Sequence, residues 1–397
     1  MKKTIRDFNL RGKRVLIRAD FNVPLDKNLN ITDDNRIRAT LPTIQYALDQ
    51  GANVVLMSHL GRPEGKPVSS MSLSPVSKRL SELLHRKVIQ CSDCVGQRVK
   101  EELSELGKET SVAVLENLRF HAQEEKNDPV FSKDLSQNGE IYVNDAFGSS
   151  HRAHASIEGV TKYLPAGAGF LLEKEIEYLG EAIQKPKKPF VAILGGSKVS
   201  DKIGVVENLI SKVDKIIIGG AMAFTFFKAQ GKNIGTSRFE KDKLDLANDI
   251  LKQAKAKNVE IILPIDNLVV QKFDESAPSK IADGGNFPDG WEGVDIGPKT
   301  AALYAKVLED AKTVVWNGPM GVFEMKPFAK GSLAVAEKLA EITRKGAVTI
   351  VGGGDTAACV IGFGLADKMT HISTGGGASL EYLEGKPLPG IVALQDK

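Results

Sequence analysis

Polar and cationic side chains follow the short apolar segments in the first half of the sequence. Four such segments are each followed by residues that could bind an anion: Arg18–Asn22, Ser58–Pro63, Glu116–Phe120 and Asn144–Phe147. The cationic stretch His151–His154 comes soon after the last of them, and twelve of the fourteen arginines lie at or before Arg152. A guanidinium group forms paired hydrogen bonds with carboxylate and phosphate. A lone arginine after a strand is usually solvated, but four cationic strand ends in one domain predict an anion-binding pocket.

Glycines take the equivalent positions in the second half. They follow the apolar segments in five places: Gly195–Lys198, Gly219–Gly220, Asn317–Pro319, Gly352–Thr356 and Thr374–Gly377. Glycine lets backbone N–H groups approach a ligand closely. The segment Gly352–Thr356 is expected to open a helix, whose first N–H groups and dipole favour phosphate. Asp355 in that turn suits Mg²⁺, although an aspartate there could also serve as a helix cap.

Several familiar catalytic motifs are absent from the sequence. It contains no G-x-x-x-x-G-K-[ST], its glycine triplet at 352–354 lacks the G-x-G-x-x-G spacing, and no nucleophile stands beside a histidine base. Transfer of a phosphoryl group between two oxyanions needs none of these, because the attacking oxygen is already ionised. Such a reaction requires positioning and neutralisation of charge.

The elements that must position these residues are short buried strands separated by amphipathic helices. Ten strands are predicted: Arg14–Ile17, Asn53–Met57, Lys87–Gln90, Val112–Leu115, Ile141–Val143, Phe190–Leu194, Lys215–Ile218, Glu260–Leu263, Thr313–Trp316 and Ala347–Val351. Several are apolar on successive residues, which is typical of parallel strands buried on both faces. Helical stretches such as Lys243–Lys257 and Gly331–Arg344 supply the crossovers. The pattern predicts an α/β fold with two doubly wound, Rossmann-like parallel-sheet domains.

The domain boundary is predicted near the middle of the chain. Leu164–Gly169 is a cluster of turn-forming residues. The pattern of Leu171–Ile183 predicts a helix, and the prolines and lysines of Lys185–Pro189 predict a stiff exposed linker. We therefore expect a first domain at 1–169, a connecting helix at 170–185 and a second domain at 186–377. A cleft between the domains is part of this prediction, because the two sets of ligand-binding residues lie in different halves.

The composition excludes several other classes of protein. The chain of 397 residues is 42% hydrophobic and 26% charged with a net charge of +3, which gives no support for nucleic-acid binding. The N-terminus lacks the apolar segment of a signal peptide, and Ile216–Phe227, the longest apolar stretch, is too short to span a membrane. Three cysteines fit a reducing compartment, so a cytoplasmic location is expected.

Cys91 and Cys94 form a C-x-x-C motif without a second C-x-x-C, which gives little support for zinc or redox chemistry. Replacing both by alanine is expected to leave activity intact and metal binding undiminished.

Six segments together resemble the signature motifs of the phosphoglycerate kinase family, in order and over nearly the whole chain. They are Asp20–Pro24, His59–Pro63, Glu116–Phe120, Gly195–Lys202, Asn317–Glu324 and Gly352–Thr356. One departure is Ser197, where the family more often has alanine. The resemblance implies reversible phosphoryl transfer from 1,3-bisphosphoglycerate to ADP, giving 3-phosphoglycerate and ATP, with Mg²⁺ accompanying the nucleotide. It further implies a cytoplasmic, monomeric enzyme of glycolysis and gluconeogenesis, and a C-terminal segment, 378–397, that returns to the first domain.

The resemblance also implies roles for individual residues. Those expected to bind phosphoglycerate are Asp20, Phe21, Asn22, Arg36, His59, Leu60, Gly61, Arg62, Arg119 and Arg152. Those expected to bind the nucleotide are Lys202, Gly219, Gly220, Gly293, Glu324, Gly353, Gly354, Asp355 and Thr356, with Asp355 at the metal. Those expected to act on the transferring group are Arg36, Lys198, Lys202, Gly375 and Gly376.

Two other classes of function remain open from the residues alone. Doubly wound sheets with glycine turns also occur in nicotinamide-dependent dehydrogenases, and a non-catalytic nucleotide-binding module would share the glycines but not the arginines. If the chain is a kinase, we expect the domains to close when both substrates are bound, with hinges at Leu164–Gly169 together with the helix that follows it, and at Thr374–Ala378.

Overall fold

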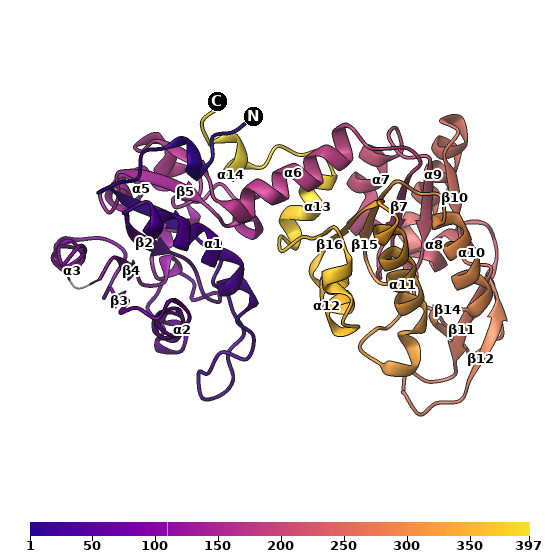
Figure 1. The fold of residues 1–397 in the computed structure, drawn as a ribbon. Coiled ribbons are helices and arrows are strands. Elements are labelled where there is room, and N and C mark those ends of the chain that lie inside the picture. The colour runs from indigo at the N-terminus through magenta and orange to yellow at the C-terminus, as the bar shows by residue number, and fades with distance from the viewer. Residues whose placement is uncertain (109) are drawn as a thin grey trace. The chain divides into compact units, whose positions relative to one another are not determined.

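The computed structural model describes residues 1–108 and 110–397, which form two compact units (Figure 1). The first unit comprises Met1–Ile176 and Pro387–Lys397, and the second comprises Glu177–Lys386. The division falls within helix α6 (Phe170–Gln184), in the region expected to connect the domains. No helix in these described ranges is long and apolar enough to cross a membrane.

The first unit contains a six-stranded parallel sheet with strand order β3–β4–β2–β1–β5–β6. Its strands are β1 (Arg14–Arg18), β2 (Asn53–Met57), β3 (Ile89–Gln90), β4 (Val112–Val114), β5 (Ile141–Asn144) and β6 (Ala166–Ala168). Its helices are α1 (Asn35–Asp49), α2 (Ser74–Leu84), α3 (Gln97–Leu103), α4 (Ala122–Glu125), α5 (Pro129–Ser136), α14 (Pro389–Val392) and the first part of α6. The chain runs outward from β1 on one side and returns to β5 on the other, so the strand order reverses at the centre of the sheet. Ligands bind beside such a reversal, beyond the carboxyl ends of the strands.

The second unit repeats this plan with the strand order β10–β8–β7–β15–β16–β17. The strands are β7 (Phe190–Leu194), β8 (Lys215–Ile218), β10 (Glu260–Ile262), β15 (Thr313–Asn317), β16 (Val348–Gly352) and β17 (His371–Ile372). The helices are α7 (Ile203–Leu209), α8 (Met222–Ala229), α9 (Leu244–Ala256), α10 (Pro298–Leu308), α11 (Lys330–Arg344), α12 (Gly354–Gly362) and α13 (Gly377–Leu383). The α/β class and the paired doubly wound sheets are therefore confirmed, and each of the ten predicted strands overlaps an observed one.

The smaller sheets of the second unit were not predicted from the sequence. β11 (Asp266–Val270) pairs antiparallel with β12 (Ser279–Asp283) and β14 (Glu292–Ile296), and β9 (Asn233–Ile234) pairs with β13 (Asn286–Phe287). β12 is polar and mostly exposed, so its sequence carries no apolar period that would reveal it.

The prediction that Leu164–Gly169 forms a turn is wrong, because its central residues form β6. This strand pairs with β5, all three of its residues are buried, and the amide of Ala168 donates to the carbonyl of Lys3 at 2.9 Å. The small residues reflect crowding: a Cβ on Gly167 would lie 2.6 Å from the Phe8 ring. A strand bonded on both sides is poorly placed to act as a hinge.

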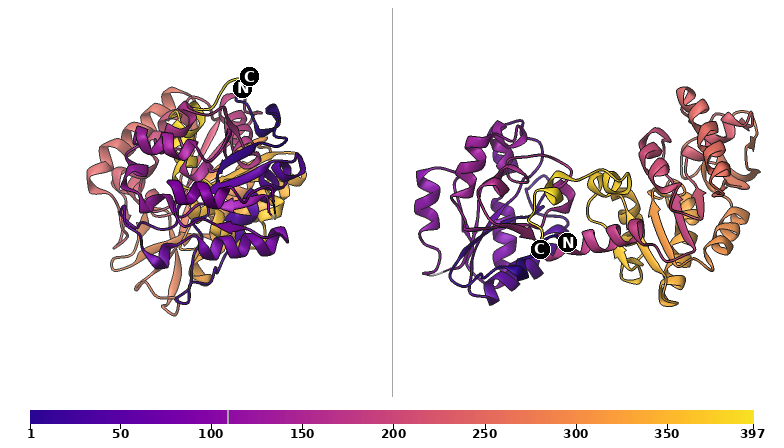
Figure 2. Two further views of the ribbon diagram at one scale, coloured as in Figure 1. Left: turned by 90° about the vertical axis from the view of Figure 1, so that its left-hand side faces the viewer. Right: turned by 90° about the horizontal axis from the view of Figure 1, so that it is seen from above.

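The C-terminal return is shorter than the expected 378–397. α13 stays in the second unit, where the side chain of Asn208 donates to the carbonyl of Leu383 at 2.7 Å. Only Pro387–Lys397 joins the first unit, where the Asn144 side chain donates to the carbonyl of Gly390 at 2.9 Å. The two chain ends lie together in both views of Figure 2, and the amide of Lys397 donates to the carbonyl of Met1.

Candidate functional site

Loops at the carboxyl ends of β1 and β2 begin the anion site of the first unit. Arg36, near the start of α1, forms an ion pair with Asp20 at 2.8 Å. The Asn22 side chain accepts a hydrogen bond from the amide of Gly61 at 2.9 Å, which ties the loop after β1 to the loop after β2. These bonds fix the segments that carry the acidic and basic groups.

The loop after β4 adds Arg119. Its guanidinium donates to the carbonyl of Gly61 at 2.8 Å and lies 3.2 Å from Glu125. Asn117, which is fully buried, donates to the carbonyl of Leu60 and accepts from the amide of Arg119. Burial lowers the pKa of Arg119 from its ordinary value, as do Arg152 and Arg18, so several cations share one small region.

His59 is buried within this group of charges, and its ring nitrogen Nδ1 lies 3.1 Å from the guanidinium of Arg18. Burial holds the pKa of His59 well below its ordinary value, with Asp20 opposing and the arginines reinforcing the shift. Burial alone would raise the pKa of Asp20, but protonated His59, Arg36 and Arg18 lower it. Since His59 is neutral at neutral pH, the two arginines keep Asp20 ionised there.

Arg18 and Glu124 form a buried network next to His59; Arg18 was predicted only as part of the cationic strand end Arg18–Asn22, and Glu124 had no predicted role. The Arg18 guanidinium, 1% exposed, donates to Ser156 Oγ at 2.9 Å and to the carbonyl of Ala19. Ser156 in turn donates to the buried Glu124 carboxylate at 2.6 Å. A lone charge at the end of the apolar β1 was the available signal for Arg18, while nothing distinguished Glu124 from a surface glutamate.

Most of the residues expected at the phosphoglycerate site are thereby brought together in one unit. The linked set comprises Asp20, Asn22, Arg36, His59, Gly61, Arg119 and Arg152. Phe21 and Leu60 pack in the hydrophobic core, so only their backbones can face a ligand. Arg62 is exposed on the loop that carries His59.

In the second unit, three of the glycines at strand ends allow backbones to pack closely. A Cβ on Gly195 would lie 2.3 Å from the carbonyl of Pro319, and one on Gly318 would lie 2.2 Å from the carbonyl of Gly195. A Cβ on Gly220 would meet the amide and carbonyl of Gly196 at about 2.5 Å. These glycines hold the loops after β7, β8 and β15 against one another.

A second set of glycines faces open space, where a ligand could approach. Nothing lies within 4 Å of the Cβ position of Gly354, which begins α12, or of Gly376, which precedes α13. Gly353 is the N-cap residue of α12 at φ +89°, so the alternative of Asp355 as helix cap is wrong. Asp355 instead lies exposed in the first turn, where its carboxylate is available to a cation.

Lys202 and Asn317 converge beside this helix start. The Lys202 ammonium donates to Asn317 Oδ1, and Asn317 is 1% exposed. The Asn317 amide nitrogen is buried without a hydrogen-bond partner and lies 3.1 Å from the Cβ position of Gly353. Burial lowers the pKa of Lys202, while Asp201, Asp355 and Glu384 oppose this. Asn317 therefore offers an unpaired donor beside the turn expected to bind phosphate, a feature that was not predicted from the sequence.

Gly375 and Gly376, the two glycines expected to donate to the transferring group, differ in their hydrogen bonds. The buried amide of Gly375 already donates to Ser373 Oγ at 3.2 Å. Gly376, at φ +50°, is held by Ser379, whose hydroxyl donates to its carbonyl and accepts from the amide of Gly353. Ser379 thus ties two ligand-facing turns together, a role that no sequence pattern revealed.

The remaining residues expected at the nucleotide lie in other loops and strands of the second unit. A Cβ on Gly219 would lie 2.3 Å from the Met320 sulfur, and one on Gly293 would lie 2.3 Å from the Phe224 ring, so both glycines allow close packing against apolar side chains. Thr356, 1% exposed, accepts a hydrogen bond from the amide of Gly318 at 2.7 Å. Lys198 and Glu324 are exposed.

These two sites define a class of protein. Arginines at the strand ends of one parallel sheet, with an open helix N-terminus, a lysine and an aspartate at those of another, are typical of an α/β phosphotransferase.

Comparison with known proteins narrows the class to one family. The family model described as phosphoglycerate kinase matches residues 5–386. The chain is 57% identical over 396 residues to a phosphoglycerate kinase of Chloroherpeton thalassium, covering 100% of this chain and 99% of that one. It is 56% identical to a cytosolic phosphoglycerate kinase of Triticum aestivum, covering 99% and 98%. The solved structure of phosphoglycerate kinase from Coxiella burnetii superimposes with a TM-score of 0.89 at 43% identity, covering 99% and 98%.

The chain belongs to the phosphoglycerate kinase family. It is therefore a kinase, an enzyme of glycolysis, and the alternatives of a dehydrogenase and a non-catalytic nucleotide-binding module are excluded.

Proposed function

We propose that the chain transfers a phosphoryl group reversibly and directly between 1,3-bisphosphoglycerate and ADP, giving 3-phosphoglycerate and ATP. The observation that supports this proposal is that the two units carry different groups of ligand-binding residues. The first unit gathers Arg36, Arg119 and Arg152 around a neutral His59, and the second holds an open phosphate-binding turn beside Lys202.

The first unit binds phosphoglycerate through its charges. Arg119 and Arg152, with exposed Arg62, provide paired donors for the phosphate at the far end of the substrate. Asp20 and Asn22 accept from or orient the substrate hydroxyl. Arg36, at the exposed edge of the cluster, meets the carboxyl end that accepts the phosphoryl group.

The second unit binds the nucleotide. Gly353, Gly354 and Thr356 hold its phosphates at the start of α12, and Gly219, Gly220, Gly293 and Glu324 line the adenosine. Asp355 fits Mg²⁺, because its exposed carboxylate adjoins the open space at Gly354 and Mg²⁺ takes few protein oxygens. When bound, this ion neutralises charge on the nucleotide phosphates.

Catalysis then consists of positioning and charge neutralisation. The attacking carboxylate or phosphate oxygen is ionised at neutral pH, so no side chain must remove a proton. Arg36 from one unit and Lys198, Lys202 and the Gly376 amide from the other stabilise the transferring group. The Gly375 amide can contribute only after leaving Ser373. The enzyme acts as a cytoplasmic monomer on small molecules.

Replacing Asp355 by asparagine is expected to weaken MgADP and MgATP binding by about ten- to a hundredfold, the usual weight of a charged contact. Binding of 3-phosphoglycerate is expected to remain unchanged, because Asp355 lies in the other unit. Isothermal titration with each ligand measures both effects.

Arg62, an exposed residue of the first unit, provides a control variant matched to Asp355→Asn. Arg62→Ala is expected to weaken 3-phosphoglycerate binding and leave MgADP binding unchanged. If either variant weakened both ligands equally, or if Asp355→Asn bound MgADP normally, the assignment of ligands to units would be wrong.

The two units are expected to close only when both substrates are bound. Direct transfer requires the donor and acceptor oxygens to lie within a few ångströms, and water must be excluded to prevent hydrolysis of ATP. Each ligand alone contacts mainly one unit and so has little differential affinity for a closed state. Since β6 is bonded within its sheet, we place the hinges where the units divide, at Ile176–Glu177 and Lys386–Pro387.

Small-angle scattering tests this closure. The radius of gyration is expected to fall clearly with 3-phosphoglycerate plus a non-hydrolysable MgATP analogue, and to fall less with either alone. No further compaction with the pair would rule out closure as the basis of direct transfer.

A further inference from the structure

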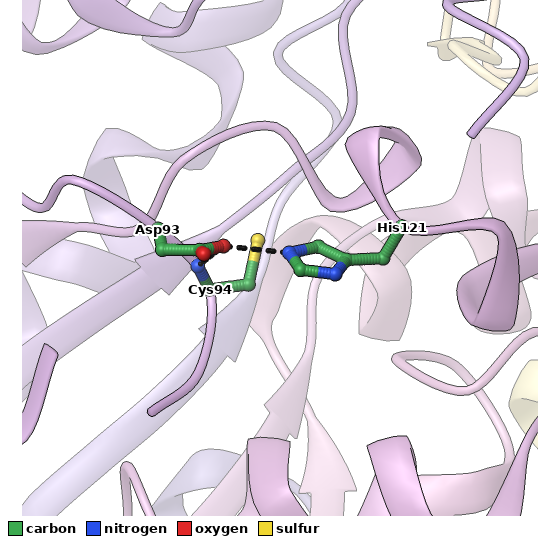
Figure 3. A group of neighbouring side chains, drawn as sticks. All are labelled: Asp93, Cys94 and His121. Carbon is green, nitrogen blue, oxygen red and sulfur yellow. Dashed lines mark hydrogen bonds and ion pairs between the residues drawn. The ribbon is translucent and has the colours of Figure 1, made fainter. Parts of the chain in front are cut away.

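Three side chains that could bind a metal lie together in the first unit, outside the phosphoglycerate site (Figure 3). Asp93 and Cys94 belong to the loop after β3, and His121 follows the 3-10 helix Leu118–Phe120. One ligand atom from each lies within 4.8 Å of the others. Asp93 Oδ1 and His121 Nε2 are 2.6 Å apart, and Figure 3 shows the Cys94 sulfur beside this pair.

The loops that carry these groups are fixed to one another by hydrogen bonds. The Cys94 thiol donates to the carbonyl of Glu116 at 2.9 Å, and the amide of Glu116 donates to the carbonyl of Asp93 at 3.2 Å. The buried Asn138 side chain donates to the carbonyl of Cys94 at 2.9 Å. The His121 ring packs on Phe131 with centroids 4.9 Å apart. The backbone is therefore arranged before any ion binds, and little ordering is needed on binding.

The donor set selects a class of ion. A thiolate, an imidazole and a carboxylate suit zinc and its close analogues, whereas Mg²⁺ prefers oxygen ligands alone. Zinc bonds of about 2.0–2.3 Å at tetrahedral angles place ligand atoms roughly 3.3–3.7 Å apart. The Asp93–His121 contact must open by less than about 1 Å to match this spacing, and the Asp93 side chain is 50% exposed and can turn.

We propose that Asp93, Cys94 and His121 bind one divalent ion of the zinc class, with water as the fourth ligand. On binding, the Cys94 thiol releases its proton to solvent and its hydrogen bond to the Glu116 carbonyl is replaced by a sulfur–metal bond. The exposed side of Asp93 leaves a path for the ion and the water. Binding contributes to folding stability by mass action, because the unfolded chain does not hold these three groups together.

This proposal revises the expectation drawn from the C-x-x-C motif. Cys91 is not part of the group. The ligand set instead combines one cysteine of the motif with His121, which lies 27 positions beyond it. Metal binding should therefore be lost in the double alanine variant, while turnover stays intact because none of the three ligands lies in the proposed catalytic machinery.

Cobalt titration of the full-length chain tests the site. After treatment with a chelator and its removal, one equivalent of Co²⁺ is expected to produce the intense near-ultraviolet band of a thiolate–Co²⁺ bond, which Zn²⁺ then abolishes. Cys94→Ser should remove the band. Asp93→Asn, at an exposed position, should weaken Co²⁺ affinity about ten- to a hundredfold. Zn²⁺ should raise the thermal unfolding temperature of the original chain but not that of Cys94→Ser.

Three control variants make the result specific. Cys91→Ser and Cys359→Ser, at the other two cysteines, should keep the band, and Asp355→Asn should keep it as well. The proposal is overturned if one equivalent of Co²⁺ gives no thiolate band, if the band persists in Cys94→Ser, or if Cys91→Ser removes it. If Cys94→Ser does not fold, unchanged Co²⁺ affinity in Asp93→Asn is sufficient to contradict the proposal.

Discussion

Arg36→Ala is expected to lower kcat by about two to three orders of magnitude, the usual effect of removing a group that meets charge in a transition state. Arg36 lies at the edge of the arginine cluster, with 42% of its side chain exposed and a 2.8 Å contact to ionised Asp20. Its charge is needed most when the phosphoryl group carries spread negative charge between donor and acceptor. The affinity for 3-phosphoglycerate should change less than kcat, because other arginines bind the ground state.

Arg38 provides a matched control. It lies on the same helix two residues further on, is 51% exposed, and pairs with Asp34. Arg38→Ala should leave kcat within about twofold, since surface substitutions change little. Steady-state kinetics in both directions measures each variant. Near-normal kcat in Arg36→Ala, or equal losses in both variants, would contradict the role given to Arg36.

Asp145 should make the first unit less stable as the pH rises from about 4 to about 7. Burial raises its pKa to about 7, although Thr43 and the amides of Leu172 and Leu171 at the start of α6 oppose the shift. A raised pKa means that the folded chain holds a proton which the unfolded chain releases near pH 4. Stability from this group is therefore complete below pH 4 and is lost by pH 7, with a change of up to about 4 kcal/mol for a shift of about three units.

Asp145→Asn isolates this effect. Asparagine keeps an acceptor for the amide of Leu171 but cannot ionise. The unfolding free energy of the variant should therefore lack the decrease between pH 4 and 7 that Asp145 causes. The difference between the two proteins, from urea unfolding at several pH values, should grow in favour of asparagine between pH 4 and 7. Replacement of exposed Asp49 controls for general charge effects. A difference that stays constant across this range would show that Asp145 is ionised in the folded state throughout.

Much of the fold was predictable because buried parallel strands leave a strong local signal. β7 is apolar at all five positions and β15 at Val314–Trp316, and every residue of both strands is buried, as expected for a sheet covered on both faces. The glycine and arginine segments were predictable for a related reason, since their residue types follow strand ends that the fold brings to one edge.

The rest depended on tertiary contacts that no local pattern records. β6 consists of small residues because Phe8 crowds it, and its sequence therefore looked like a turn. Ser379 and Asn317 act through partners far away in the chain. Glu124 became part of the site only through the fold, which buries it beside Ser156.

A coupled assay with 3-phosphoglycerate and MgATP tests the proposed reaction most directly. The purified chain should form an acyl phosphate, detected by trapping with hydroxylamine, and one ADP should appear for each acyl phosphate. Without phosphoglycerate, ATP should remain intact, because water is excluded from direct transfer. The reaction proposed for this chain would be contradicted if ADP appeared without acyl phosphate, or if folded protein gave no acyl phosphate with both substrates present.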